Sequence, residues 1–393
     1  MRIGFWLTTP KKFDPAKIDE TPFGGAEISA INLAKELSCN EEHRITVFGN
    51  CSSANIGGNE NPIGVSYWPY ESLKNKSLDV LICVRADQNL LNPRRNHQYF
   101  GSIRPKKVIL WTGDAFDQPN NQAIFHDSYC LKTFDLIVAK SNWQKESLLK
   151  HFPLLSKEKV QVMYNGVDSN SIPPITVTTE PRFVYASTAY RGLHRFLDIW
   201  PKIKEKIPNA TLDCYCKTTL YIDDNPRESE FEGLYDKISA MPGVTIKDPL
   251  PQKDFLKELS KYRLMLYPNS GFLESSCGVV LQSMACEVPV ITTDSAGLSE
   301  TVRLGVGNYL VFEGEYYDSR FVDAVMCQMK SLNIKEDAKS SRDMILENYS
   351  WEKVAERWDS LIQTLTSPSE TKELTANKYD SQESASEFSP AVA

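Results

Sequence analysis

Residues Leu264–Thr292 read LMLYPNSGFLESSCGVVLQSMACEVPVIT, and this stretch decides which fold class we predict. The apolar run Leu264–Tyr267 predicts a buried strand, and the proline, asparagine, serine and glycine that follow it are typical of a turn. Gly278–Ala285 then predicts a helix, and Pro289–Thr293 predicts a second strand. A strand, a crossover helix and another strand form the repeating unit of a parallel sheet with helices on its faces.

The same alternation extends through almost the whole chain. Further short apolar runs predict strands at Arg2–Thr8, Arg44–Asn50, Asp79–Arg85, Lys107–Thr112, Asp135–Lys140, Val160–Tyr164, Arg182–Ser187, Thr211–Cys216 and Val244–Lys247. Helical patterns lie between them at Ala26–Leu37, Gly192–Lys206, Glu228–Ala240 and Gln252–Lys261. We therefore predict an α/β protein with two doubly wound, Rossmann-like domains that face a central cleft at the carboxyl ends of their strands.

The length of 393 residues suits two such domains. The segment Asn170–Pro181 is rich in proline, serine and threonine, which is typical of a connection between domains. We place the first domain at residues 1–172 and the second at 173–346. A helix is expected at 347–365, and the polar tail at 366–393 has too few large aliphatic residues to predict ordered structure.

The composition excludes several classes of function. A net charge of -7 argues against a broad electrostatic surface for nucleic acid. No apolar run approaches the roughly 18 residues of a membrane span, and the N-terminus does not resemble a signal peptide. Nine cysteines, an odd number at scattered positions, favour reduced thiols. We therefore expect a cytoplasmic protein.

Three glycine- or arginine-containing turns follow predicted strands, where a doubly wound sheet binds ligands. Gly24 and Gly25 open the first helix, where free N–H groups can approach an anion, although a Gly-Gly pair is also common in ordinary loops. Arg191 begins the turn before Gly192 and either binds phosphate oxygens or is a solvated surface charge.

The third turn is the stretch quoted above. The start of the helix Gly278–Ala285 offers partial positive charge to a phosphate, and Glu274 and Gln282 flank it. Both side chains can hydrogen-bond hydroxyl groups, although Gln282 could instead bond to a neighbouring backbone group. Hydroxyls on both sides of a diphosphate describe a nucleotide sugar, so this is the ligand that we predict.

At this point the sequence resembles the retaining glycosyltransferases of family four, which have the GT-B fold. The resemblance spans roughly residues 2–365. It rests on the order of five motifs: Gly24-Gly25-Ala26-Glu27, Asn165-Gly166-Val167-Asp168, Arg191-Gly192-Leu193, Tyr267-Pro268-Asn269 and Pro289-Val290-Ile291. It implies that the helix beginning at Tyr349-Ser350-Trp351 crosses back to pack on the first domain.

The resemblance also implies roles for individual residues. Gly24 and Gly25 would lie against the donor diphosphate, Arg191 would neutralise it, and Glu274 would contact the donor sugar. The remaining donor-binding residues implied are Ser275, Ser276, Cys277, Gly278, Val279 and Gln282. Asp114, in Trp111–Asp117, would orient the acceptor hydroxyl or the sugar, although a role in capping a turn is equally compatible with its position.

The chain departs from the family pattern at three places. Gln282 stands where the family usually has a second glutamate, so the ribose contact loses its charge-assisted strength. Tyr185-Ala186 stands in place of a Gly-Arg pair, and Arg195 is a candidate to compensate for the missing arginine. Cys277 replaces a glycine, with Gly278 one place late.

We therefore expect a retaining glycosyltransferase that moves a sugar from a nucleoside-diphosphate sugar to a hydroxyl of a glycan, a lipid or another acceptor. No Asp-X-Asp triplet occurs, so no metal and no cofactor other than the donor are predicted. Two alternatives stay open: a sugar-nucleotide epimerase of the same fold, and a non-catalytic scaffold that binds sugar nucleotides or glycans. The basic segment Asn92–Lys107 predicts a solvated loop, or else a peripheral contact with anionic lipid or a charged acceptor.

Overall fold

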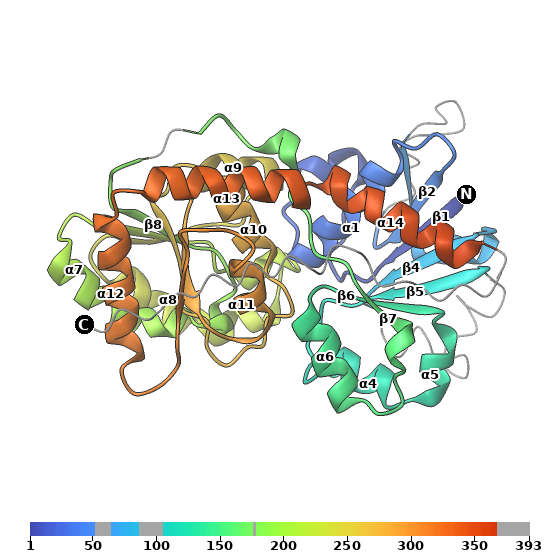
Figure 1. Ribbon diagram of the computed structural model, residues 1–393, viewed down its shortest axis with the longest axis horizontal. Coiled ribbons are helices and arrows are strands. Elements are labelled where there is room, and N and C mark those ends of the chain that lie inside the picture. The colour runs from blue at the N-terminus through green and yellow to red at the C-terminus, as the bar shows by residue number, and fades with distance from the viewer. Residues whose placement is uncertain (52–63, 86–104, 176–177, 368–393) are drawn as a thin grey trace.

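The computed structural model describes residues 1–51, 64–85, 105–175 and 178–367. Most of the basic segment Asn92–Lys107 and nearly all of the predicted tail lie outside these residues. Figure 1 shows two α/β domains side by side, each built around its own sheet, with a run of helix across the top that joins them.

The first domain contains a seven-stranded sheet in the order β3-β2-β1-β4-β5-β6-β7, in which every pair is parallel. Its strands are β1 (Arg2–Leu7), β2 (Arg44–Gly49), β3 (Val65–Pro69), β4 (Val80–Val84), β5 (Lys107–Trp111), β6 (Leu136–Ala139) and β7 (Val160–Val162). The helices described here are α1 (Gly25–Leu37), α4 (Pro119–Phe125), α5 (Ser128–Thr133) and α6 (Asn142–His151).

The second domain repeats this topology with six strands, in the order β10-β9-β8-β11-β12-β13. They are β8 (Arg182–Tyr185), β9 (Thr211–Cys214), β10 (Val244–Ile246), β11 (Leu264–Tyr267), β12 (Val290–Thr293) and β13 (Tyr309–Val311). Its helices are α7 (Phe196–Lys206), α8 (Glu232–Ser239), α9 (Gln252–Leu259), α10 (Gly278–Ala285), α11 (Ala296–Val302), α12 (Tyr317–Lys330) and α13 (Ile334–Tyr349).

Both orders reverse direction beside the first strand of each domain, between β1 and β4 and between β8 and β11. Ligands of doubly wound sheets bind in the crevice at this point, outside the carboxyl ends of the strands. The predicted fold class, two Rossmann-like domains of the GT-B type, is confirmed.

Buried side chains cover both faces of the first sheet because its inner strands are mainly apolar on both faces. On β1, Ile3, Phe5 and Leu7 face a core shared with α1, whereas Trp6 faces the opposite core with α4, α5 and α6. The second sheet has one continuous core cluster, which includes Trp200 of α7.

Helix α14 (Trp351–Thr366) returns from the second domain to the first, as the family resemblance predicts. In Figure 1 it continues the line of α13 and lies over α1. Trp351 and Trp358 of α14 belong to the core of the first domain, and the Trp358 ring meets that of Trp111 edge-on at 5.1 Å. The chain crosses between domains next to an earlier crossing, because Val167 exchanges backbone hydrogen bonds with Tyr349 (2.8 Å) and Trp351 (3.0 Å).

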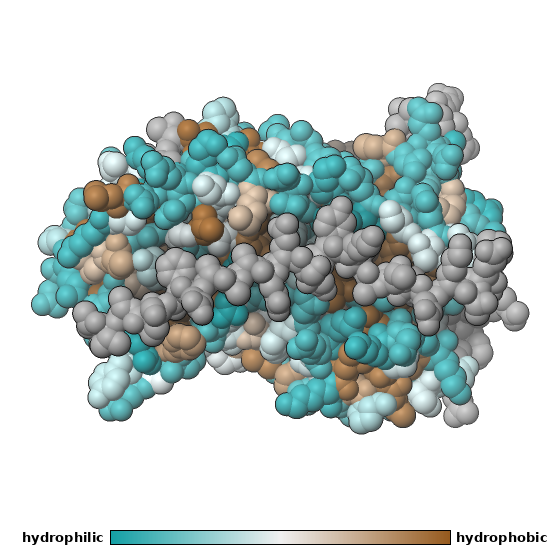
Figure 2. Space-filling view, viewed as in Figure 1, coloured by the Kyte–Doolittle hydropathy of each residue, from teal (hydrophilic) through white to brown (hydrophobic). Residues whose placement is uncertain are grey.

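The surface of the face shown in Figure 2 is mainly hydrophilic, and its hydrophobic residues occur in separate small groups. Among the described residues, no helix has both the length and the apolar character needed to cross a membrane.

Candidate functional site

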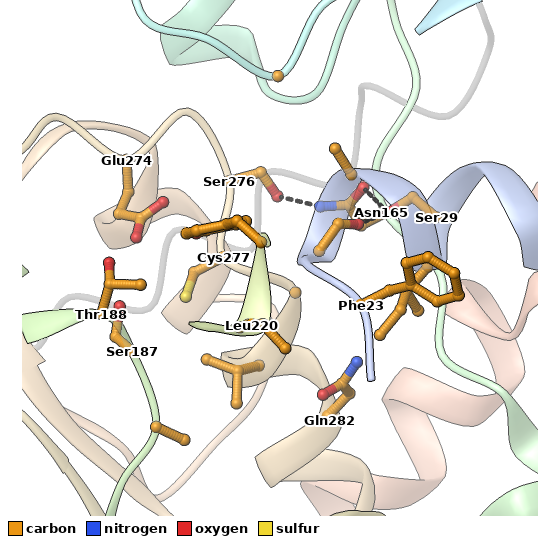
Figure 3. Close-up of a pocket in the computed structure, with 18 of the residues that line it drawn as sticks. Phe23, Ser29, Asn165, Ser187, Thr188, Leu220, Glu274, Ser276, Cys277 and Gln282 are labelled. Atoms are coloured by element: carbon orange, nitrogen blue, oxygen red, sulfur yellow. Dashed lines mark hydrogen bonds between the residues drawn. The ribbon is translucent and has the colours of Figure 1, made fainter. Parts of the chain in front are cut away.

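A cavity lies between the two domains, with an empty volume of about 1370 Å³ that is partly open to solvent. Its walls come from loops after the carboxyl ends of the strands of both sheets, as expected for facing doubly wound domains. The first domain contributes Arg85 after β4 and Lys140 after β6, and the second contributes Arg191 after β8 and Glu274 after β11. Figure 3 shows part of this wall, with Glu274 and Gln282 on opposite sides and Cys277 between them.

Two helix starts face the cavity without a side-chain cap. Gly25 is the first residue of α1 and Gly278 the first of α10, and neither helix has an N-cap side chain that accepts a hydrogen bond from the first turn. A Cβ added at Gly25 would meet no atom within 4 Å, and one at Gly278 would only reach Asn165 at 4.0 Å. The backbone is therefore open to a ligand at two positive helix ends.

Gly24 does not line the cavity. A Cβ at this position would lie 2.7 Å from the Tyr221 ring, which belongs to the loop after β9. Glycine is therefore required here by the close approach of Tyr221, which packs between the first domain and Arg191.

Arg191 is held by the turn that follows it. Gly192 has φ +122°, and a Cβ there would lie 2.1 Å from the carbonyl oxygen of Pro268, so only glycine fits. The turn aims the Arg191 side chain into the cavity, where it donates to Glu274 Oε1 at 2.9 Å and stacks 4.1 Å above the Phe272 ring centroid. The other nitrogens of Arg191 are bound less tightly. Its Nε has no hydrogen-bond partner, and its Nη2 donates to the Tyr190 and Tyr221 hydroxyls at 3.4 Å each.

Glu274 is a buried carboxylate whose Oε1 is held by two donors. Its Oε1 accepts from Arg191 and from the Tyr267 hydroxyl at 2.7 Å. Burial opposes the charge on Arg191, but Glu274 and the surrounding phenols raise the pKa of Arg191 well above its usual value. Arg191 and Glu274 therefore form a fixed, charged pair in the wall of the cavity.

The loop after Glu274 is attached to the first domain. Ser275 Oγ donates to the Gly113 carbonyl at 2.5 Å, and Asn165 Nδ2 donates to Ser276 Oγ at 3.4 Å. Asn165 in turn accepts from Ser29 of α1 at 3.2 Å, as the dashed lines in Figure 3 show. The cavity is thus closed on one side by a hydrogen-bonded seam between the domains.

All the predicted donor-binding residues except Gly24 line this one cavity: Gly25, Arg191, Glu274, Ser275, Ser276, Cys277, Gly278, Val279 and Gln282. The side chain of Gln282 makes no hydrogen bond with another described residue, so it is not tied to the neighbouring backbone. The thiol of Cys277 is buried, which together with the nearby Glu274 raises its pKa and keeps it protonated. Cys277 is therefore no nucleophile.

Asp114 is brought to the cavity only indirectly. It is 5% exposed and does not line the cavity, but its Oδ1 lies 3.2 Å from Nε of Arg85, which does. Asn120 also donates to it at 3.0 Å. Asp114 therefore positions Arg85, and direct contact with an acceptor stays a prediction.

Two cations of the first domain are additional to the predicted set. Arg85 has φ +54°, an unusual conformation for a residue with a side chain, and Lys140 is 5% exposed. Each lies at the end of a predicted strand, Asp79–Arg85 and Asp135–Lys140, so strand ends alone would have identified them. Arg195, by contrast, is absent from the cavity wall, because it pairs with Glu313 at 2.8 Å and stacks on Tyr317.

Metal binding has no visible basis in the part of the chain that the structure describes, where no cluster of three His, Cys, Asp or Glu side chains could hold an ion. Cys214 and Cys216 are buried free thiols whose pKa values are raised by burial. Metal independence of a reaction stays a prediction.

Comparisons with known proteins agree with this architecture. A family model described as Glycosyl transferases group 1 matches residues 180–330. The alpha-maltose-1-phosphate synthase of Mycolicibacterium smegmatis is 24% identical over 254 residues, which are 57% of this chain and 61% of that protein. This chain thus spans less than two thirds of the length of that relative.

Two solved structures superpose over nearly the whole chain. HepE of Anabaena, in complex with UDP and glucose, gives a TM-score of 0.68 at 15% identity and covers 93% of this chain and 100% of its own. The sucrose-phosphate synthase of Thermosynechococcus elongatus gives 0.69 at 14% identity, with 93% and 99% covered.

Two facing Rossmann-like domains, a cleft between their carboxyl edges and a returning final helix define a GT-B protein. Within this class, residues 180–330 of the second domain match the model of group 1 glycosyl transferases, and the predicted resemblance is confirmed.

Proposed function

We propose that this protein transfers a glycosyl group from a nucleoside-diphosphate sugar to an acceptor hydroxyl, with retention of the anomeric configuration. The observation that carries the proposal is the Arg191–Glu274 pair, at 2.9 Å, placed in one cavity with the open helix starts of α1 and α10. The matching family and the UDP complex of HepE support the donor class. Retention follows from the family resemblance.

The second domain holds the donor in this proposal. The N–H groups at Gly278 and Gly25 bind the diphosphate, and Arg191 adds the positive charge of its guanidinium group. When the bond to the leaving diphosphate breaks, negative charge develops on the phosphate oxygens. Fixed dipoles and a fixed cation stabilise that charge without reorganising, so no metal is required.

Glu274 and Gln282 bind hydroxyls at the two ends of the donor. Glu274 accepts from the transferred sugar through its Oε2, because its Oε1 already accepts from Arg191 and Tyr267. Gln282 bonds the ribose through an amide, which is neutral and can also donate. We therefore expect weaker ribose binding than a glutamate would give.

Ala186 lines the cavity where the family resemblance implies an arginine, and this favours one alternative, a scaffold that binds sugar nucleotides without catalysis. Slow hydrolysis or transfer with any donor of a panel would exclude the scaffold. An altered donor sugar in the absence of acceptor would indicate an epimerase instead.

Replacement of Arg191 tests the proposal. We expect Arg191→Met to lower turnover of the best donor by ~10²–10³-fold, the usual cost of losing one charge-stabilising donor. The control is Arg195→Met one turn later, which lies outside the cavity and should change turnover little. Full activity of Arg191→Met would remove the basis for the diphosphate site.

A further inference from the structure

Lys140 is a buried lysine whose ammonium group reaches the cavity. It follows β6 directly, is 5% exposed and lines the cavity wall contributed by the first domain. Its neighbour Gly113 leaves room for it, since a Cβ on Gly113 would lie 3.2 Å from Lys140 Cε. Its Nζ lies over the Trp111 ring, 5.0 Å from the ring centroid, which is a cation–π contact.

The other cations of the cavity wall all have a carboxylate partner. Arg85 lies 3.2 Å from Asp114, Arg191 2.9 Å from Glu274, and Lys217 2.5 Å from Asp248. Lys140 makes neither an ion pair nor a side-chain hydrogen bond with any other described residue. Among the described residues of the cavity wall, it is thus the one cation whose side-chain nitrogen has neither a carboxylate nor a hydrogen-bond partner, although it does contact the Trp111 ring.

Such a group is costly to the folded protein. Burial and, next, the nearby positive charge of Arg85 lower the pKa of Lys140 to about 7. An apolar side chain of the same length would avoid this cost, so an unpaired ammonium at a cavity wall indicates a ligand that completes it.

We propose that Lys140 binds a phosphate or carboxylate group of the acceptor, so that the acceptor is an acidic sugar derivative. This inference rests on the proposed glycosyl transfer. In the proposed function the donor diphosphate lies between Arg191 and the helix starts at Gly25 and Gly278. Lys140 and Arg85 instead follow β6 and β4 of the first domain, which faces the acceptor. Because Arg85 already pairs with Asp114, Lys140 is the cation of the described first-domain wall that has no carboxylate within ion-pair distance.

The test measures binding of glucose 1-phosphate, glucose 6-phosphate, glucuronate and neutral glucose to the full chain saturated with UDP, by titration calorimetry. We expect at least one acidic sugar to bind the wild type ten-fold or more tightly than glucose does. Lys140→Met should abolish that preference, and Lys140→Arg should keep most of it. Lys150→Met, an exposed position on α6, is the matched control and should behave as the wild type.

Three outcomes would overturn the inference. One is a wild type that prefers none of the acidic sugars, and another is an unchanged preference in Lys140→Met. The third is found by measuring two donors in the same way. If Lys140 is needed for tighter binding of UDP-glucuronate than of UDP-glucose, and no acidic acceptor is preferred, the anion bound by Lys140 belongs to the donor. Failure of the wild type to bind UDP, ADP, GDP or any other nucleoside diphosphate would instead refute the proposed function. Misfolding is separated by the melting temperature, because Lys140→Met should be at least as stable as the wild type.

Discussion

Arg191 and Lys140 are two buried cations of one cavity whose pKa values are shifted in opposite directions: that of Arg191 is raised and that of Lys140 is lowered. Arg191 touches a carboxylate and three aromatic rings or phenols, so its charge is fixed at every accessible pH. Burial and, next, the positive charge of Arg85 lower the pKa of Lys140 to about 7, so its charge is marginal. The first suits a permanent phosphate site, and the second suits a site that is charged when its ligand arrives.

The stability of the protein should therefore depend on pH through Lys140. The pKa of Lys140 is about 7 in the folded protein, whereas an ordinary lysine has a pKa of 10.5, which applies to the unfolded chain. Between pH 7 and pH 10.5 the unfolded chain therefore binds more protons than the folded protein does. Stability of the wild type then rises with pH, by at most about 1.4 kcal/mol per pH unit from this group. The facing charges of Arg85, Asp114, Glu27 and Glu274 are present in both proteins compared below.

We expect Lys140→Met to melt above the wild type at pH 6, and the difference in Tm to shrink steadily as the pH rises to 9. Calorimetric melting of both proteins in matched buffers measures it, and other titrating groups cancel in the difference. A difference that is constant with pH would contradict a perturbed lysine.

The place of a residue in the site can be predicted from the sequence where a requirement of the backbone fixes that residue. Gly192 and Arg191 were predictable because a strand end, an arginine and a glycine form a recognisable turn. The role of Arg85 was not predictable, because its position opposite Arg191 depends on how two domains face each other. Asp114 illustrates the same point: its residue type is visible in the sequence, but its partner is not.

At the scale of elements, helix α6 of the first domain packs on helix α11 of the second domain and so forms a further contact between the domains. Glu300 of α11 accepts from the backbone N–H groups of Asn142 (3.0 Å) and Trp143 (2.9 Å), the first residues of α6. A carboxylate at a helix N-terminus compensates the free N–H groups and the positive end of the dipole. Here the carboxylate comes from the other domain, so one interaction both caps a helix and joins the domains.

Glu300→Ala should therefore destabilise the protein by about 1–2 kcal/mol, the usual cost of a lost cap with its charge. Glu300→Gln, which keeps two polar atoms but loses the charge, should cost less. The melting temperature of each variant measures this, with Glu146→Ala on the exposed face of α6 as the control. If Glu300→Ala and the control are equally stable, the contact of Glu300 with the start of α6 does not stabilise the protein.

The elements that the sequence predicts are mainly the inner strands, because these are apolar on both faces. The pattern does not predict the partly buried edge strands β3 and β13, although it does predict β7 and β10 at the opposite edges of the two sheets. Helix α12 is also absent from the predictions, although the spacing of its buried Tyr317, Phe321 and Val325 carried a helical signal.

At the scale of the molecule, the two domains have separate hydrophobic cores that are joined by two consecutive helices, α13 in the second core and α14 in the first. Trp351, Val354, Trp358 and Ile362 of α14 are buried in the core of the first domain. Because α13 packs on α10 in the second domain, this pair of helices ties both domains into one structure.

Trp358→Ala should cost about 3–5 kcal/mol, the typical effect of removing a fully buried large aromatic side chain. The loss should appear in the melting of the first domain, although the substitution lies far from it in the sequence. Leu332→Ala is the control, since that side chain is 97% exposed and should leave the Tm unchanged. If both variants melt like the wild type, α14 does not contribute to the core.

Because α14 follows both sheets in the sequence, its position also determines the order in which the parts of the first domain are synthesised. A ribosome releases the first domain's entire sheet long before Trp351 is made, and until then the apolar groove around Trp111 has no cover. The nascent first domain must therefore wait, incomplete and prone to association, until the second domain has emerged and the chain has turned back. Translation of the late segments, rather than of the first domain itself, sets the moment when that domain becomes complete.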